Sequence, residues 1–217
     1  QGQRQLQQDE DDDGQGKNPS VGTFRVLVLL LRFTDHADRK LPDQYQYQIL
    51  WNLRIKKWLQ ENSYGRYNAY FDVQDWAMTD NTEEYYSFGE FGRISAVQNA
   101  FHPLLNELDA KPDWSWAPYD VNNDGYLDNL IVLHSGYAAE EGGTDCTNGR
   151  SAENRIWSHA FASAGEWVSS NGQYRIMGYM IASALDLKCN SNTAHMGVMT
   201  HEYMHTFSLI GKKKCFV

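Results

Sequence analysis

The sequence predicts an α/β domain of three layers, in which a mixed sheet lies between helices. Apolar runs of strand length occupy residues 24–33, 127–134 and 174–182, as expected of strands buried on both faces. Segments with the apolar spacing of a helix lie between these runs, at residues 42–60 and 91–108. Strands that alternate with helices are typical of a three-layer α/β fold. The 217 residues, 41% of them hydrophobic, suffice for one packed core, and the chain has no internal repeat.

The N-terminal twenty residues differ from the rest in composition. Residues 1–20 are mainly Gln, Asp and Gly, with almost no apolar side chains. Such a segment buries too little apolar surface to offset the entropy cost of ordering. We therefore expect residues 1–20 to be a disordered tail, linker or propeptide remnant, and residues 21–217 to form the folded domain.

The charge of the chain excludes two classes of partner. Its formal net charge is −9 and its pI is near 5.2, whereas nucleic acids and anionic membranes select for basic surfaces. The longest apolar run, residues 26–31, is far shorter than a membrane span. We therefore expect no nucleic-acid partner and no membrane span. We also expect a monomer.

The first half of the chain alternates strand and helix patterns. The buried strand at residues 24–33 precedes the helix at 42–60, and an Asn-Ser-Tyr-Gly stretch at 62–65 ends that helix. Residues 70–76 then suggest a second strand. The next helix, residues 91–108, presents an inner face of Ile94, Val97, Phe101, Leu104, Leu105 and Leu108.

The second half contains the buried strands at residues 127–134 and 174–182, and then a last helix from about Ala194. This helix carries an HExxH motif. Residues four apart project from one helix face, so His201 and His205 can present two imidazoles to one Zn²⁺. Zinc with an open position lowers the pKa of its bound water to about 7. Glu202 is then the candidate general base for attack of water on a peptide carbonyl.

The motif has an alternative interpretation as an ordinary amphipathic helix with exposed histidines, because this spacing also arises by chance. The helix is strongly apolar, and two unpaired imidazoles would be costly to bury in it, so a metal is the more economical partner. Its apolar residues are Val198, Met199, Tyr203, Met204, Phe207, Leu209 and Ile210.

A second metal-binding pattern precedes the strand at residues 127–134. Oxygen ligands occupy positions 1, 3, 5, 7 and 9 of an EF-hand-like loop, and Gly125 stands at position 6, where the chain turns sharply. These ligands are Asp120, Asn122, Asp124, the backbone carbonyl of Tyr126, and Asp128. Position 12 is Ile131 instead of a bidentate Glu, so the loop is not a true EF-hand.

A remaining calcium ligand could come from the segment after this strand, from Glu140, Glu141 or Asp145. The alternative interpretation is a solvated turn, since Asn, Asp and Gly favour turns by themselves. Because five positions are correctly placed, we expect a structural Ca²⁺.

Three segments of the chain together resemble a known family. Residues 63–67 read SYGRY after a helix; residues 119–136 contain the acidic loop and are followed by Glu140-Glu141 and by IWSH at 156–159; and residues 196–205 carry the HExxH motif. In this order they resemble the M6 family of secreted metallopeptidases, the immune inhibitor A-like group. The resemblance implies a secreted zinc endopeptidase with a metzincin-like α/β fold and bound calcium, acting on protein or peptide substrates.

The family's motif continues as HExxHxxGxxD, and the resemblance implies that the aspartate is the third zinc ligand. Here Ser208 stands at the glycine position and Gly211 at the aspartate position. Peptide-hydrolysing zinc sites normally use three protein ligands. His195 lies about 9 Å from His201 along a helix axis, too far to substitute easily, and the Cys215 thiolate is a further candidate.

We therefore expect a catalytic domain that is truncated at its C-terminus. The competing hypothesis is a catalytically inactive, calcium-stabilised fragment or isoform of the same fold that lacks the third ligand.

We expect structural roles for the cysteines and for two further histidines. Cys146, Cys189 and Cys215 allow one disulfide, which is compatible with secretion, and we favour the Cys146–Cys189 pair because both flank polar loops. His134, at the end of an apolar strand, is expected to be satisfied in the core, and His159 to be a structural residue beside a buried Trp157.

Overall fold

The computed structural model describes residues 21–93, 97–186 and 192–207. The predicted N-terminal tail at residues 1–20 lies outside the described residues. So do Cys189, Ser208, Gly211 and Cys215. The expectations for all of these residues therefore stay predictions.

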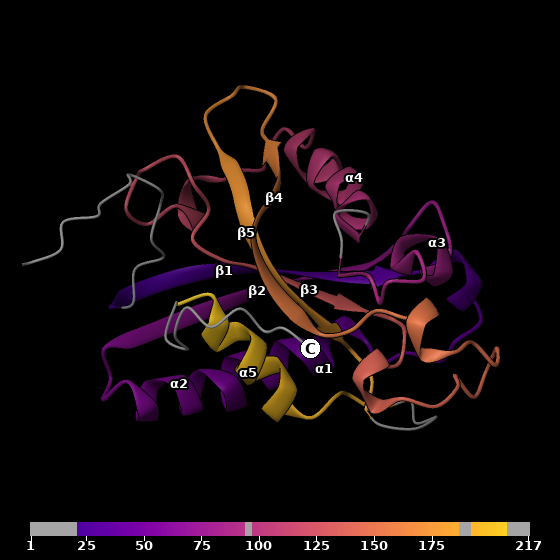
Figure 1. The fold of residues 1–217 in the computed structure, drawn as a ribbon. Coiled ribbons are helices and arrows are strands. Elements are labelled where there is room, and N and C mark those ends of the chain that lie inside the picture. The colour runs from indigo at the N-terminus through magenta and orange to yellow at the C-terminus, as the bar shows by residue number, and fades with distance from the viewer. Residues whose placement is uncertain (1–20, 94–96, 187–191, 208–217) are drawn as a thin grey trace, which may run out of the picture.

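A five-stranded mixed sheet in the order β2-β1-β3-β5-β4 forms the centre of the molecule (Figure 1). Its parallel strands are β1 (Gly22–Arg32), β2 (Tyr67–Met78), β3 (Leu130–His134) and β5 (Arg175–Ser183). At one edge, β4 (His159–Val168) pairs antiparallel with β5. The mixed α/β character predicted from the sequence is confirmed, whereas the separate strand β4 was not predicted.

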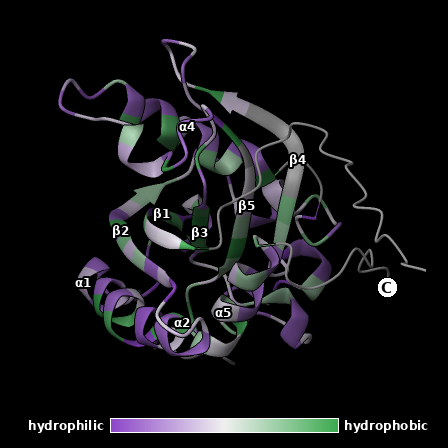
Figure 2. Cartoon of the chain, turned by 90° about the vertical axis from the view of Figure 1, so that its left-hand side faces the viewer, coloured by the Kyte–Doolittle hydropathy of each residue, from purple (hydrophilic) through white to green (hydrophobic). Residues whose placement is uncertain are grey.

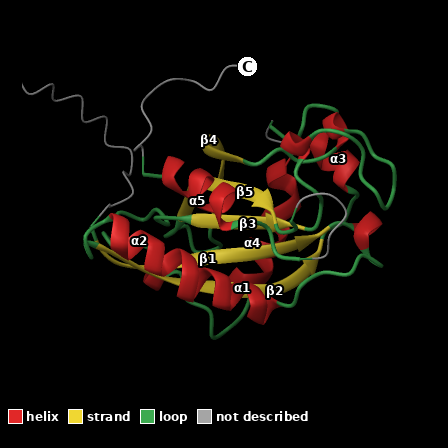
Figure 3. Cartoon of the chain, turned by 90° about the horizontal axis from the view of Figure 1, so that it is seen from below, coloured by secondary structure: helices red, strands yellow, loops and turns green. Residues whose placement is uncertain are grey.

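Helices cover both faces of the sheet, so the domain has three layers. Alternate residues of β1 divide between two cores, because successive side chains of a strand point to opposite faces. Leu27, Leu29 and Leu31 pack on the side of α4, and Val26 and Val28 on the side of α1, α2 and α5. Figure 3 shows α1, α2 and α5 on the same side of the sheet, with α4 behind it. Hydrophilic residues colour much of the outer surfaces of α1 and α2 (Figure 2).

The helix predicted at residues 42–60 is one continuous helical segment in three parts. It comprises α1 (Gln44–Ile49), the π-helical turn η2 (Leu50–Ile55) and α2 (Lys56–Asn62). Asp43 begins it with a reciprocal cap, because its side chain accepts from the Gln46 backbone while the Gln46 side chain accepts from the Asp43 backbone. The helix ends where Gly65 adopts a positive φ of 74°, as the sequence predicts.

The second predicted helix begins later than expected. Phe91 and Gly92 have φ values of 60° and 67°, which a right-handed helix does not allow, and α4 runs over Gln98–Asp109. The expected helical structure from residue 91 is therefore wrong at its start, and residues 94–96 lie outside the described residues. A short helix that the sequence did not signal, α3 (Glu83–Ser87), precedes this region.

Short 3₁₀ turns and the last helix complete the described chain. The 3₁₀ turns are η1 (Thr34–His36), η4 (Ala117–Tyr119), η5 (Ala139–Glu141) and η6 (Ala152–Asn154), and the last helix is α5 (Met196–His205). In the part of the chain that the structure describes, no helix combines the length and the apolar composition needed to cross a membrane.

Candidate active site

Helix α5 carries the HExxH residues and is fixed to the sheet by its inner face. Met199 and Tyr203 are fully buried in the core beneath the helix. The Tyr203 ring makes edge contacts with the rings of Trp51 and Phe71, at centroid distances of 6.1 and 5.8 Å. Aromatic packing of this kind holds a helix at a defined height and rotation. The helix rotation in turn fixes where His201, Glu202 and His205 point.

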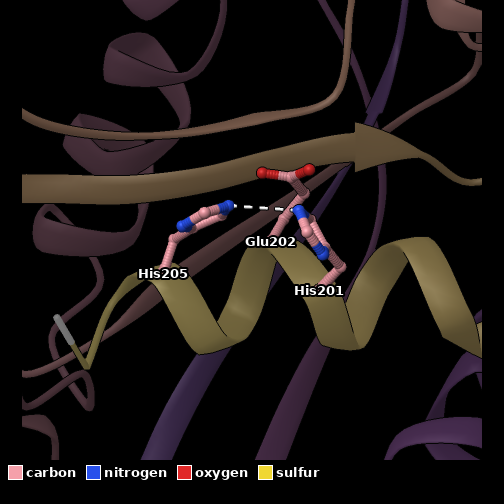
Figure 4. A group of neighbouring side chains, drawn as sticks. All are labelled: His201, Glu202 and His205. Atoms are coloured by element: carbon pink, nitrogen blue, oxygen red, sulfur yellow. Dashed lines mark hydrogen bonds between the residues drawn. The ribbon is translucent and has the colours of Figure 1, made fainter. Parts of the chain in front are cut away.

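The two histidines of the motif face each other at metal-binding distance. Nε2 of His201 lies 3.2 Å from Nε2 of His205. Figure 4 shows both imidazoles and the Glu202 carboxylate on the same side of α5. Ligand atoms of His201, Glu202 and His205 all lie within 4.8 Å of one another. The helical spacing predicted from the sequence therefore brings all three groups together.

The environment of Glu202 favours a carboxyl group that exchanges protons near neutral pH. Burial, assisted by the negative charge of Glu140, raises the pKa of Glu202 to about 7, although a backbone hydrogen bond from Ala160 in β4 lowers it. Partial burial and the neighbouring His201 lower the pKa of His205, which keeps its ring nitrogen available as a ligand. Glu140 is itself held in place, because its Oε2 accepts the Ser158 backbone N–H at 3.0 Å.

One argument made from the sequence about this helix is wrong. Met199 and Tyr203 of α5 are buried in the core, whereas Val198 and His201 are exposed and His205 is half-buried. The histidines therefore impose no burial cost that a metal must offset. Their mutual geometry, which the sequence pattern only implies, is the better argument for a metal.

The third zinc ligand is not identified among the described residues. Ser208, Gly211 and Cys215, which the sequence argument concerns, lie outside the described ranges. His195 precedes α5 and its Nε2 contacts Asp186 Oδ1 at 3.0 Å. His195 thus lies before the helix and contacts Asp186, and the expectation that it does not complete the zinc site stays a prediction.

Comparison with known proteins identifies the family of this chain. The family model of the immune inhibitor A peptidase M6 catalytic domain matches residues 51–212, a stretch that includes the HExxH helix. The chain belongs to the M6 peptidase family. The resemblance seen in the three sequence segments is thus confirmed, and M6 peptidases are metallopeptidases.

One curated relative of this M6 peptidase domain is a much longer protein. Immune inhibitor A of Bacillus thuringiensis subsp. alesti is 25% identical to the chain over an alignment of 235 residues. The alignment includes 88% of this chain and 34% of the relative. The chain thus spans about a third of the length of the curated relative that it matches.

The predicted calcium loop is held together by its own hydrogen bonds. The Asp120 carboxylate accepts the backbone N–H groups of Asp124 and Gly125 at 3.1 and 3.0 Å. The Asp128 carboxylate accepts the Val121 N–H at 2.8 Å, and Asp124 accepts the Tyr126 N–H at 2.8 Å. This bonding is that of the Asx-rich turn named as the alternative. The predicted ligands lie in one loop, but among the described residues its carboxylates do not form a cluster within 4.8 Å.

The proposed extra calcium ligands lie at other places in the molecule. Asp145 is buried and bonds to Nη2 of Arg39 at 2.6 Å. Glu140 lies near Glu202 and Ser158, as described above. The interpretation of Asp145 and Glu140 as partners of the loop is therefore not supported by their contacts.

Two further histidines differ in part from their expected environments. Both ring nitrogens of His159 have partners, the Trp157 carbonyl at 2.7 Å and the Tyr179 hydroxyl at 3.3 Å. The neighbouring Trp157 is 37% exposed, so it is not the buried Trp that the sequence suggested. His134 is fully buried as expected, but its Nε2 atom has no hydrogen-bond partner in the described part of the chain.

Proposed function

We propose that this chain is the catalytic domain of a secreted zinc endopeptidase that hydrolyses peptide bonds in proteins or peptides. The observation that carries this proposal is the 3.2 Å separation of the His201 and His205 Nε2 atoms, with Glu202 on the same side of α5. Two nitrogen ligands bound about 2.1 Å from one tetrahedral zinc lie roughly 3.4 Å apart. The observed separation of the two imidazole nitrogens is therefore close to that of two ligands of one zinc.

Zinc held by His201 and His205 would polarise the peptide carbonyl and acidify a water molecule. The Glu202 carboxylate would accept a proton from the attacking water and deliver it to the leaving amine nitrogen, so that water adds across the cleaved bond. The half-buried position of Glu202 suits this role, because a general base works best when its pKa lies near the operating pH.

The other parts of the proposal concern secretion, calcium and the type of fold. Cys146 is disulfide-bonded, which fits an oxidising, extracellular compartment. A structural Ca²⁺ at the loop of residues 120–128 would replace the hydrogen bonds that its carboxylates now accept from the loop backbone. The layering of helices on both faces of a mixed sheet is compatible with a metzincin-like domain.

The Glu202→Gln variant tests the proposed chemistry. We expect the wild-type chain to bind zinc and to cleave an unstructured protein substrate, and the variant to bind zinc equally while losing activity by about 10²–10⁴-fold. Glu107→Gln on α4, an exposed residue on the opposite face of the sheet, is the matched control and should cleave at the wild-type rate. Equal activity in the Glu202→Gln variant would refute the assignment of Glu202 as the base.

The second candidate function is a catalytically inactive domain of the same fold. It is favoured by one observation, the Gly211 that stands where the family motif has its third ligand. A wild-type chain that is folded but binds zinc weakly and cleaves no substrate would support this candidate over the peptidase.

A further inference from the structure

A second group of metal-ligand side chains lies in the interior, away from the HExxH helix. His36 follows β1, Glu83 opens α3 and Asp145 follows η5. One ligand atom from each of these residues lies within 4.8 Å of the other two, and all three residues are buried. The sequence did not signal this group, because its members are far apart in the chain and belong to no common motif.

Two atoms that face each other in this cluster have no hydrogen-bond partner among the described residues. Nε2 of His36 and Oε2 of Glu83 lie 3.6 Å apart, and both are orphaned and inaccessible to solvent. The exposed fraction of the Glu83 side chain is 0% and that of His36 is 1%. A buried polar group without a hydrogen-bond partner destabilises the fold by about 1–3 kcal/mol, and by more when it is charged. Two such atoms 3.6 Å apart are therefore best explained by a ligand that binds both.

The other polar atom of each side chain has a hydrogen-bond partner, so Nε2 of His36 and Oε2 of Glu83 are the atoms left to bind a ligand. Oε1 of Glu83 accepts the Ile156 N–H at 3.2 Å. Nδ1 of His36 lies 2.9 Å from Oγ of Ser135. A metal-binding histidine normally donates its second ring N–H to an oxygen acceptor, which directs the lone pair of the other nitrogen to the metal. Ser135 is placed to act as that acceptor.

The third side chain is supported in the same manner. Asp145 Oδ2 accepts from Arg39 Nη2, and Arg39 Nη1 donates to the Ser135 carbonyl at 2.8 Å. The adjacent Cys146 is disulfide-bonded, which restrains the segment that carries Asp145. Arg39 and Ser135 therefore connect His36 to Asp145 through supporting hydrogen bonds, and the Ile156 N–H holds Glu83 separately.

We propose that His36, Glu83 and Asp145 form a second, structural metal site for a divalent cation such as Zn²⁺ or Mn²⁺. One imidazole and two carboxylates suit these cations, whereas Ca²⁺ and Mg²⁺ prefer oxygen ligands alone. The 3.6 Å separation of Nε2 and Oε2 is close to the roughly 3.4 Å between two ligands of one tetrahedral zinc. Closing the site around the ion requires side-chain shifts on the order of 1 Å at Asp145. The ion would tie the ends of β1 and β3 to α3.

The charges around the cluster are compatible with a bound cation. Arg39 pairs with Asp145 and Arg150 pairs with Asp35, whereas no arginine pairs with Glu83 among the described residues. A cation at Oε2 would offset the cost of keeping the Glu83 carboxylate ionised in the interior.

The test uses the full chain in a His201→Ala/His205→Ala background, so that it does not depend on the proposed peptidase site. Excess Ca²⁺ is added to fill sites made of oxygen ligands alone, so that they do not take up Zn²⁺. The number of Zn²⁺ ions bound per chain is then measured after equilibrium dialysis. The visible absorption of bound Co²⁺ is the second probe. We expect about one Zn²⁺ per chain in this background, and loss of that ion when Glu83→Gln is added. Glu84→Gln, its more exposed neighbour in α3, is the matched control and should keep the ion.

A folded background variant that binds no Zn²⁺, or a Glu83→Gln variant that keeps it, would overturn the proposal. If Glu83→Gln fails to fold, Ser135→Ala provides the second test, because it removes the hydroxyl that orients His36 and keeps all three candidate ligands; the same hydroxyl also accepts the Phe33 N–H at 3.1 Å, so the fold of the variant is checked first. We expect Ser135→Ala to weaken Zn²⁺ binding by about 10–100-fold. Unchanged affinity in that variant would equally refute the site.

Discussion

The hydroxyl groups of Tyr67 and Tyr203 lie 2.5 Å apart and join β2 to the helix that carries the HExxH motif. Both rings are buried, and burial raises the pKa of both hydroxyls, so each remains a neutral donor and acceptor. Tyr203 follows Glu202 directly in the sequence. The hydrogen bond thus fixes the rotation of α5 from beneath, while the candidate catalytic groups project from above.

Removing both of these hydroxyls should cost less than the sum of the costs of removing each one. We expect Tyr203→Phe to destabilise the fold by about 1–3 kcal/mol, because the Tyr67 hydroxyl is left buried without its partner. The double variant Tyr67→Phe/Tyr203→Phe should be less destabilised than the sum of the two single variants. Urea denaturation of the four proteins measures this coupling, and strictly additive losses would contradict the pairing.

Two glycines should respond in opposite ways to replacement by alanine. A Cβ at Gly136 would overlap the buried Glu83 carboxylate, which Ile156 holds in place, so we expect Gly136→Ala to destabilise by about 1–3 kcal/mol. A Cβ at Gly197 in α5 meets nothing within 4 Å, and Gly197→Ala should stabilise the fold by up to about 1 kcal/mol. Thermal denaturation compares the two, and equal melting temperatures would show that Glu83 can move aside freely.

Calcium should stabilise the domain through the loop of residues 120–128. We expect added Ca²⁺ to raise the melting temperature of the wild-type chain by several degrees, since a ligand that binds only the native state stabilises it. Asp128→Asn should reduce this rise, because it removes one carboxylate charge from the loop. Asp113→Asn, at an exposed position before the loop, is the control. A rise of the same size in both variants would place the calcium elsewhere.

The stability of the domain should depend on pH through His102 in α4. Burial lowers the pKa of His102 below its usual value of 6.5, so the native state favours the neutral ring. As the pH falls through 6.5, the unfolded chain binds a proton that the native state resists, and this contribution to stability is lost. We expect His102→Gln to show a shallower fall in stability between pH 7 and pH 5. Parallel curves for the two proteins would exclude His102 as a source of the slope.

The candidate zinc site was predictable because its geometry is local. Helical periodicity alone puts His201 and His205 on one face, and the structure places their Nε2 atoms 3.2 Å apart. The acidic loop was also recognisable in the sequence. Its pattern does not distinguish a calcium site from a turn in which the Asp and Asn side chains accept hydrogen bonds from the loop backbone. The contacts of Asp120 and Asp128 are those of the turn.

The sequence by itself determined the buried strands, the long first helix and the face of α5 that carries the motif. The strands follow from continuous apolar runs and the helices from a repeat of 3.6 residues, and each signal lies within one segment. Only the tertiary structure decided that β4 lies antiparallel at the sheet edge beside Glu202, and that Arg39 meets Asp145 across 106 positions of the chain. Local periodicity specifies which side of an element is buried. It does not specify which distant side chains share the same buried space, because that depends on the order of the strands in the sheet.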